Sequence, residues 1–307
     1  MTKYLILGGT GFIGQNLVNS LERSGALVTV LSKNQSDIFK NTTVEHVVGD
    51  FANIDVIDEL VAKNDVVIHL VSSTTPGDSN NDPEKDVLEN LVPSIHLINL
   101  MSKLGNKKLI YISSGGAVYG NSVESPIREN SDAWPISSYG ITKMAIEKHI
   151  FMHVAKGDLD ARIIRASNPY GPFQSGANNQ GVIANFIRKS LRHEKIMVWG
   201  DGTVVRDYIY VDDLVLAILK LVDYSGSELI FNIGSGLPTS INDLLNQLEL
   251  EMGLKLEVEF TPSRDVDVHS NVLDITKAKG EINWEPTIKL SQGLKRTINW
   301  WKSQLAS

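Results

Sequence analysis

The feature that most constrains the fold is a set of regularly spaced glycines near the start of the chain. Residues 4–7 form a short apolar run, and Gly8, Gly11 and Gly14 follow it at intervals of three residues. Over residues 12–23 the apolar side chains recur at the spacing of a helix, whereas a continuous apolar run is typical of a buried parallel strand. The sequence therefore predicts a strand, a tight turn and a helix in immediate succession.

Strand-like and helix-like segments alternate along the next part of the chain. Apolar runs typical of strands lie at residues 27–31, 44–48, 65–71, 108–113 and 161–165. Helical patterns lie between them at residues 54–63, 86–104 and 139–156. Because alternating strands and helices are typical of an α/β fold, we predict a doubly wound parallel Rossmann sheet.

The glycine spacing also predicts a ligand for the first turn. Glycine permits a tight turn and a close approach of the backbone to a pyrophosphate, and the N-terminus of the following helix donates N–H groups to it. Such a pattern between a strand and a helix is typical of a dinucleotide site. We therefore predict that Gly8, Gly11, Phe12, Ile13 and Gly14 bind a dinucleotide cofactor.

The residues after the second, third and fourth strands are expected to meet the adenosine end of this cofactor. Ser32 and Lys33 stand where an acidic residue usually holds the ribose hydroxyls. A hydroxyl beside a cation could accept a 2′-phosphate, which favours NADP over NAD, but a solvated surface lysine is the alternative. Asp50 could accept from the adenine amino group or be an ordinary turn residue. Phe51 and Leu70 complete the predicted cofactor contacts.

The regular alternation ends near residue 169. Further strands are expected at residues 207–211 and 229–233, and helices at residues 240–252 and 290–303. Ser240 is expected to cap the first of these helices, because a serine oxygen accepts readily from the amides of a first turn.

These patterns predict two lobes. We expect residues 1–169 to form the dinucleotide-binding Rossmann domain, with later segments at about 203–235 returning to it. Residues 170–307 are expected to form mainly a smaller C-terminal substrate-binding lobe. No linker rich in Pro, Gly or Ser separates the two parts, so we expect a large shared interface with a cleft, where ligands usually bind.

Composition argues against several classes of function. The chain has 307 residues, a formal net charge of −7 and no cysteine. The lack of cysteine excludes disulfides and thiolate metal sites, and the negative charge argues against a nucleic-acid partner. Because there is neither a long apolar run nor a signal-peptide pattern, we expect no membrane partner and a cytoplasmic location. His149 and His153 have metal-ligand spacing, but no third ligand is visible, so no metal is expected.

A candidate proton-transfer pair lies in the helical pattern at 139–156. Tyr139 and Lys143 are four residues apart, which places both side chains on one face of a helix. A nearby ammonium favours the phenolate of a tyrosine whose ordinary pKa is about 10. A surface tyrosine and a solvated lysine are the alternative. Ser113 and Ser114 at the end of the fifth strand favour the catalytic interpretation, because that end of a parallel sheet faces the ligand crevice.

These segments, in this order, resemble the extended short-chain dehydrogenase/reductase family, specifically its NAD-dependent epimerase/dehydratase branch of UDP-glucose 4-epimerase-like nucleotide-sugar enzymes. The resemblance covers nearly the whole chain. It is carried by residues 8–14, 113–120, 139–143, 168–171, 200–202, 206–213 and 284–286.

The resemblance implies a role for each residue of the catalytic site. Tyr139 would exchange a proton with the sugar 4-hydroxyl while the nicotinamide takes or returns the C4 hydride. Lys143 would bind the nicotinamide ribose and lower the pKa of the tyrosine. The serine or threonine of the family usually lies four residues before the tyrosine of Val-Tyr-Gly, where this chain has Gly115. Ser114, its neighbour, is expected to replace it, unless a water does so.

The resemblance also implies the substrate contacts. Asn168 would contact the nucleotide sugar, and Arg206 and Arg264 would clamp its diphosphate. Asp267 would contact the nucleotide ribose. Without the family pattern, both arginines would be read as members of surface ion pairs.

From these observations we predict a nucleotide-sugar 4-epimerase that works by transient C4 oxidation with bound NAD or NADP. Its partners would be a nucleotide-diphosphate sugar and a second copy of the chain in a homodimer. The first alternative is an NADPH-dependent reductase of nucleotide-linked 4-keto-6-deoxyhexoses, which Ser32, Lys33 and Gly115 favour. A non-catalytic nucleotide sensor on the same fold is the alternative from another class. A 4,6-dehydratase is disfavoured, because residues 115–117 offer no carboxylate for the elimination.

Overall fold

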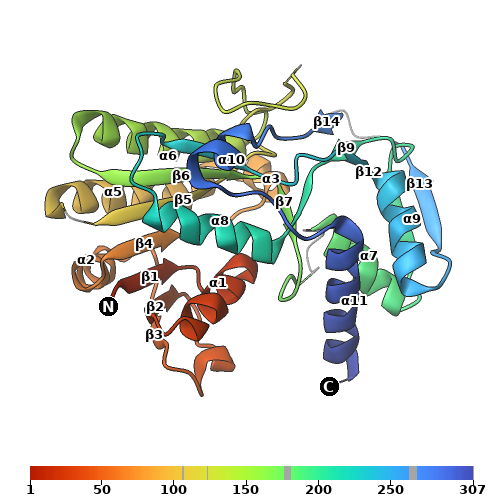
Figure 1. The fold of residues 1–307 in the computed structure, drawn as a ribbon, viewed down its shortest axis with the longest axis horizontal. Helices are drawn as coiled ribbons and strands as arrows, with labels where there is room; N and C mark the ends of the chain where they lie inside the picture. The colour runs from red at the N-terminus through yellow and green to blue at the C-terminus, as the bar shows by residue number, and fades with distance from the viewer. Residues whose placement is uncertain (106, 123, 176–180, 263–267, 307) are drawn as a thin grey trace.

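The structure is a computed structural model that describes residues 1–105, 107–122, 124–175, 181–262 and 268–306. Its centre is a seven-stranded sheet in the order β3-β2-β1-β4-β5-β6-β11, in which every neighbouring pair is parallel (Figure 1). The strands are β1 (Lys3–Leu7), β2 (Leu27–Ser32), β3 (Glu45–Val48), β4 (Val66–His69), β5 (Lys108–Ser114), β6 (Asp160–Ala166) and β11 (Ile230–Ile233). The predicted doubly wound parallel sheet is confirmed.

Helices cover both faces of this sheet. One face is covered by α1 (Phe12–Arg23), α8 (Val211–Asp223) and α10 (Thr276–Ile282). The other face is covered by α2 (Ile54–Lys63), α5 (Val92–Leu104) and α6 (Ser138–Lys156). Because the strands contribute side chains to both cores, their sequences read as continuous apolar runs. The second face carries the predicted catalytic helix, α6.

A smaller group of elements lies beside the sheet (Figure 1). It contains α7 (Val182–Leu191), α9 (Ile241–Met252), α11 (Leu290–Ala306) and the parallel pair of β8 (Ile196–Trp199) with β13 (Val258–Thr261). Apolar side chains of these elements form a core of their own. Ser240 caps α9 as expected, in a reciprocal capping box with Asp243. That this group binds the substrate stays a prediction.

Short strands lie where the two parts meet. β7 (Asn168–Tyr170) pairs with β10 (Tyr208–Tyr210), and β9 (Val205–Arg206) pairs with β12 (Thr239–Ser240) and β14 (Ser270–Asn271). Tyr170 and Tyr210 pack in the core of the smaller group, whereas Ile209 packs in the core of the sheet. Farther along the chain, β11 returns to the edge of the large sheet.

The helix expected over residues 86–104 is present, begins at Pro83 and contains a π-helical turn. α4 (Pro83–Asp86) leads into a π-helical turn, η2 (Val87–Leu91), and then into α5. Pro93 lies in the first turn of α5 and has no N–H to donate to the preceding turn, so a regular ladder of hydrogen bonds cannot run through it. The expected helix is confirmed, and the π-helical turn within it is a feature that the sequence pattern did not predict. Single π-helical turns are frequent at functional sites.

The strand expected over residues 207–211 is shorter than the sequence suggested. β10 ends at Tyr210, and Val211 already begins α8. Asp212 and Asp213 lie in the first turn of that helix, where the helix dipole favours acidic side chains. The apolar Val211 therefore belongs to the helix, although in sequence it continues the strand pattern.

Candidate active site

The glycine turn between β1 and α1 is shaped to receive an anion. Gly8 has a φ of 88°, a conformation that favours glycine, and Gly11 N donates to Gly8 O over 3.1 Å. A Cβ atom on Gly14 would lie 2.3 Å from Gly8 O, so a larger residue does not fit. Gly11 is the N-cap of α1 and has no side chain to cap it, so the first amides, including those of Phe12 and Ile13, suit a phosphate group. This turn fits the pyrophosphate of a dinucleotide.

Three predicted cofactor residues meet at the ends of β2 and β3. Lys33 Nζ lies 3.0 Å from Asp50 Oδ2, and both side chains are exposed. The buried Ser32 hydroxyl donates to Asn34 O over 3.0 Å and lies 2.7 Å from His46 Nε2. Sequence reasoning missed His46, although its place on β3 beside β2 could have indicated it. The structure thus brings a cation, a carboxylate and an imidazole together here.

Phe51 and Leu70 lie deeper at the same edge of the sheet. Phe51 is buried, and its ring centroid lies 4.8 Å from that of His69 at the end of β4. Leu70 is half-buried and its N–H donates to Leu7 O over 3.0 Å. Burial, together with the charge of Lys143, lowers the pKa of His69 to about 3, so its imidazole is neutral. Phe51 packs in the core on the α6 face of the sheet, whereas Leu70 packs against the core on the opposite face.

The predicted catalytic pair lies in the first two turns of α6. Ser137 caps this helix by accepting from Gly140 N over 3.2 Å. Tyr139 and Lys143 then follow one turn apart on the side that faces β5, where Lys143 Nζ donates to Ile112 O over 3.1 Å. The structure therefore places Tyr139 and Lys143 on one face of the helix, as their spacing of four residues predicts.

The Lys143 ammonium is buried between two tyrosine rings. Its nitrogen lies 5.1 Å from the ring centroid of Tyr111 and 5.6 Å from that of Tyr139. Burial lowers the pKa of Lys143 to about 8, although the negative charges of Asp86 and Glu147 act in the opposite direction. A lysine in this state is close to its titration point near neutral pH.

Two serines act on the pKa of the Tyr139 phenol. Burial raises the pKa of Tyr139 to about 12, and hydrogen bonds with Ser72 and Ser114 act in the opposite direction. Ser114 is thus among the groups that act on Tyr139, and its catalytic role stays a prediction. Ser72 was left without a role in the sequence analysis, although it follows β4 as Ser114 ends β5, and that position at the crevice edge could have indicated it.

Gly115 has a packing reason to lack a side chain. A Cβ atom there would lie 2.7 Å from Leu273 Cδ1 and 3.2 Å from Ala166 O. The Gly115 carbonyl also accepts from the buried Asn271 side chain over 3.0 Å. A serine at 115 would therefore require Leu273 to move, which leaves Ser114 as the hydroxyl at the end of β5 that acts on the phenol.

Two predicted substrate residues lie near each other on short strands. Asn168 on β7 donates through its side-chain amide to Asp207 O over 2.9 Å, and Arg206 is the residue before Asp207. Arg206 Nη1 donates to Val205 O over 2.9 Å and to Val268 O over 2.7 Å. Arg264 and Asp267 lie outside the described residues. The roles of all four stay predictions.

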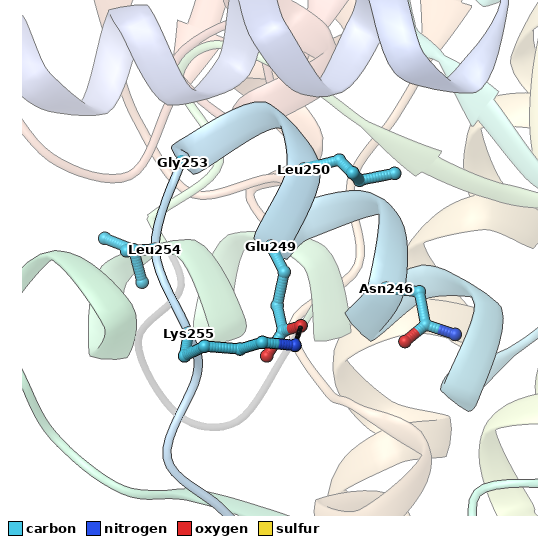
Figure 2. A pocket seen from close by; sticks show the side chains of 6 residues that line it. All are labelled: Asn246, Glu249, Leu250, Gly253, Leu254 and Lys255. Carbon is cyan, nitrogen blue, oxygen red and sulfur yellow. Dashed lines mark hydrogen bonds and ion pairs between the residues drawn. The ribbon is translucent and has the colours of Figure 1, made fainter.

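Two surface hollows lie outside this arrangement of side chains. One lies at the C-terminal end of α9 in the smaller lobe, as Figure 2 shows, and is lined by Asn246, Glu249, Leu250, Gly253, Leu254 and Lys255. There Lys255 Nζ is paired with Glu249 Oε2 at 2.6 Å. The other adjoins the loop after β4 and is lined by Ser73, Thr74, Asp78, Asn81, Asp82 and Lys85. The second begins at Ser73, the residue after Ser72, and neither hollow is lined by Tyr139 or Lys143.

His153, one of the two histidines with metal-ligand spacing, contacts polar side chains of the protein. His153 is buried, and its ring nitrogens lie 2.9 Å from Asp158 Oδ1 and 3.1 Å from Asn99 Oδ1. Within the described ranges, no group of three or more acidic or histidine side chains could hold a metal ion. In the same part of the chain, no helix is long and apolar enough to cross a membrane.

Comparison with known proteins identifies the family. The model of the NAD dependent epimerase/dehydratase family matches residues 4–234. UDP-glucose 4-epimerase from Thermotoga maritima, solved with UDP-glucose, is 34% identical with a TM-score of 0.93, and the match covers 99% of this chain and 100% of that chain. UDP-glucose 4-epimerase from Thermus thermophilus, solved with NAD, is 27% identical with a TM-score of 0.89, and the match covers 98% and 99% of the two chains.

A relative with another activity matches equally well. The dTDP-4-dehydro-6-deoxyglucose reductase of Escherichia coli is 33% identical over 305 residues, which cover 96% of each chain. The family's dependence on NAD confirms the predicted class of cofactor, NAD or NADP. Since the family model spans most of the sequence and relatives align along nearly all of it, this chain belongs to the NAD dependent epimerase/dehydratase family.

Proposed function

We propose that the protein is a nucleotide-sugar 4-epimerase, acting on a substrate such as UDP-glucose or UDP-N-acetylglucosamine. One observation carries the proposal: the Lys143 ammonium, which donates to Ile112 O over 3.1 Å, lies 5.6 Å from the ring centroid of Tyr139, and the Ser72 and Ser114 hydroxyls lower the pKa of that phenol. A phenol, a hydroxyl and an ammonium at the crevice edge form a proton-transfer site next to a pyrophosphate turn. The likeness to the Thermotoga epimerase with UDP-glucose supports this reaction.

In this proposal the edge of the sheet holds the cofactor along its length. The turn of residues 8–14 binds the pyrophosphate through backbone amides, and Ser32, Lys33 and Asp50 meet the adenosine end. Phe51 and Leu70 pack beside it. When bound, the nicotinamide ring supplies the oxidation and reduction at C4 of the sugar.

Tyr139 takes the proton of the sugar 4-hydroxyl and later returns it. Because burial raises the pKa of this phenol to about 12, it begins protonated near neutral pH. It can accept the sugar proton only after it has released its own proton to solvent, and the positive charges of the Lys143 ammonium and of an oxidised nicotinamide would favour that release. Ser114 donates to the same oxygens and keeps the sugar hydroxyl in line with the phenol, while Lys143 also binds the nicotinamide ribose.

The substrate contacts extend this proposal to the smaller lobe. Asn168 contacts the nucleotide sugar, and Arg206 with Arg264 clamps its diphosphate through charged hydrogen bonds. Asp267 accepts from the ribose of the nucleotide. These assignments place the reacting sugar between the sheet and residues 170–307.

A specific observation favours a second function, the NADPH-dependent reduction of a nucleotide-linked 4-keto-6-deoxyhexose. Lys33 gives the adenosine site a cation where NAD enzymes usually have a carboxylate, and His46 Nε2 lies 2.7 Å from the hydroxyl of the preceding residue, Ser32. The Escherichia coli reductase is also as similar to this chain as the epimerases are. The two functions differ in stoichiometry, because an epimerase consumes no cofactor and a reductase oxidises one NADPH for each sugar.

Identification of the cofactor together with a substrate panel tests this proposal. The cofactor is released from purified protein and identified, and the protein is then incubated with UDP-glucose, UDP-N-acetylglucosamine and dTDP-4-keto-6-deoxyglucose, with and without NADPH. Conversion of a UDP-sugar to its C4 epimer without added cofactor supports the epimerase. Consumption of NADPH with the keto sugar establishes the reductase instead, and cofactor binding with no turnover of any sugar supports the sensor.

A further inference from the structure

A buried carboxylate lies directly behind the catalytic pair. Asp86, at the end of α4, is 1% exposed. It accepts hydrogen bonds from Thr142 Oγ1 at 2.7 Å, Asn90 Nδ2 at 3.0 Å and Ser138 Oγ at 3.2 Å, and a fourth from Thr74 Oγ1. Among the residues that the structure describes, no basic side chain forms an ion pair with it. A buried carboxylate solvated only by neutral donors is costly to maintain, so it calls for an explanation.

The first set of its donors belongs to the catalytic helix. Ser138 and Thr142 flank Tyr139 in the first turns of α6. The same turns are clamped by α3 (Pro76–Asn81), from which Asn80 Oδ1 accepts from Ser138 N and Ser79 Oγ accepts from Tyr139 N, each over 2.9 Å. The segment before Asp86 therefore fixes the backbone of the catalytic tyrosine, and a negative charge at this helix N-terminus is favourable.

The second set of donors holds the loop that contacts the phenol from the other side. Thr74 donates to Asp86, and its carbonyl accepts from Ser72 Oγ over 3.2 Å. Asn90 donates to Asp86 and accepts from Ser73 N over 2.9 Å. The Ser72 hydroxyl in turn acts on the Tyr139 phenol, whose pKa it lowers. One carboxylate thus joins the loop after β4 to the helix that carries Tyr139.

The π-helical turn anchors this arrangement to the sheet. The Asn90 carbonyl accepts from Ser94 Oγ over 2.6 Å, and Ser94 Oγ lies 2.9 Å from His69 Nε2 at the end of β4. The Asn90 side chain also donates to the backbone carbonyl of Asp86 over 3.1 Å. The position of Asp86 is therefore set from both its side chain and its main chain.

We infer that Asp86 is a positioning residue for the proposed reaction: by holding both the first turns of α6 and the loop at residues 72–74, it sets the place of the Tyr139 phenol between Ser72, Ser114 and Lys143. The inference rests on the proposed function of Tyr139. Asp86 does not touch the sugar or the cofactor in this account. Its effect on turnover is transmitted through Ser72, Ser138 and Thr142.

Besides its hydrogen bonds, the charge of Asp86 also affects Lys143 and Tyr139. It raises the pKa of both Lys143 and Tyr139. The other charged groups around Lys143 are Glu147 and Arg165, which form a buried ion pair at 2.7 Å. The titratable neighbours from the strands are Tyr111 on β5, whose pKa burial raises, and the neutral His69 on β4. Arg165 neutralises the charge of Glu147. Asp86 is therefore the carboxylate whose charge has the larger effect on the pKa of Lys143.

The test compares two substitutions with a matched control. Asp86→Asn keeps the shape and some hydrogen bonds but removes the charge, and Asp86→Ala removes both. Asp213→Asn is the control, because Asp213 is also a buried carboxylate that accepts from a hydroxyl, Thr287 Oγ1, at 2.9 Å, but it lies on α8 on the other face of the sheet.

Kinetics on a sugar that the wild type converts provide the first readout. We expect Asp86→Asn to lower kcat about tenfold and Asp86→Ala about 10²-fold, with little change in KM, since small displacements of catalytic groups act on turnover. Both limbs of the pH profile of kcat in Asp86→Asn should move to lower pH by about half a unit. Asp213→Asn should leave both pH limbs in place. An unchanged kcat, or a lower kcat with unmoved pH limbs, would overturn the inference.

Hydrogen–deuterium exchange provides a readout that needs no turnover. Amides in a peptide covering residues 137–143 should exchange about tenfold faster in Asp86→Asn than in the wild type, and Asp213→Asn should not change them. If no sugar is converted by the wild type, the proposed function fails, while this exchange still decides whether Asp86 holds the helix. If Asp86→Ala does not fold, the isosteric Asp86→Asn decides the question, and unchanged exchange in that variant contradicts the inference.

Discussion

At the scale of single residues, burial reverses the usual order of two pKa values. It lowers the pKa of Lys143 to about 8 and raises that of Tyr139 to about 12, because both charged forms lose solvation. In the protein alone, the phenol therefore holds its proton more strongly than the lysine does. The lysine by itself therefore does not bring the pKa of the phenol near neutrality. Added positive charge is needed to turn Tyr139 into a base.

Replacing Tyr139 by phenylalanine tests its role directly. Tyr139→Phe should lower kcat by about 10²–10⁴-fold, because only the proton-transfer group is removed. Cofactor affinity, measured by calorimetry, should stay within about threefold of the wild type, because the pyrophosphate turn is untouched. Tyr4→Phe, in the first strand, is the control and should turn over normally. Normal turnover in Tyr139→Phe would remove this residue from the mechanism.

The buried ammonium of Lys143 makes a prediction for stability. Its pKa is about 8 in the folded protein and 10.5 in the ordinary state, so the unfolded chain binds more protons between these values and stability rises with pH there. Lys143→Met should therefore raise the free energy of unfolding at pH 7 by about 2–3 kcal/mol. The advantage should shrink as the pH approaches 10. Urea unfolding at pH 7, 8, 9 and 10 measures it, and an advantage that does not change with pH would contradict a depressed lysine pKa.

The ion pair at the adenosine end makes a prediction for cofactor choice. If Lys33 meets a 2′-phosphate, Lys33→Ala should weaken 2′,5′-ADP about tenfold and 5′-AMP much less, since a charged hydrogen bond contributes roughly 1.5–3 kcal/mol. Lys63→Ala is the control, because Lys63 is an exposed lysine with its own acidic partner, Glu59. Binding is measured by calorimetry. If the affinities for both nucleotides fell equally, Lys33 would not contact the 2′-phosphate, and NAD would be the favoured cofactor.

At the scale of elements, local patterns predicted the main supports of the site. The glycine turn, the helix from Phe12 to Arg23 and the pairing of Tyr139 with Lys143 all depend on spacings of a few residues, so the sequence displays them. The capping of α9 by Ser240 is equally local. These features follow from backbone geometry and are independent of what the rest of the chain does.

The parts that the sequence did not predict depend on contacts between distant segments. Ser79 accepts from the amide of Tyr139, 60 positions farther along the chain, and Asp86 accepts from Thr142, 56 positions farther along. No periodicity records such contacts. The same holds for Leu273, which fills the space beside Gly115 and so explains the missing serine. The sequence did not predict the π-helical turn, because Pro93 interrupts a helical pattern that is otherwise continuous.

At the scale of the whole molecule, exposed apolar side chains on α5 and α6 support the predicted homodimer. Val92, Ile141 and Phe151 are 51%, 57% and 56% exposed, and Met152 is 40% exposed. Large apolar side chains gathered on neighbouring helices are typical of a protein interface. A dimer through these helices would bring the second copy against the helix that carries Tyr139.

Substitution at this face tests the dimer. Phe151→Asp should turn a dimer into a monomer, because a buried, unpaired carboxylate in an apolar interface is unfavourable. Leu250→Asp on α9 is the control, since Leu250 is 73% exposed on the smaller lobe. Light scattering after size-exclusion chromatography measures the mass. A wild-type monomer, or a Phe151→Asp variant that stays dimeric, would contradict an interface at this face.

The fate of a deuterium label at C4 of the sugar tests the central claim most directly. UDP-glucose labelled with deuterium at C4 is incubated with the protein without added cofactor, and both epimers are analysed by mass spectrometry. The account predicts that the C4 epimer forms with the deuterium retained, and that Tyr139→Phe forms none. An epimer that has lost the label to solvent would contradict oxidation at C4 by a bound nicotinamide.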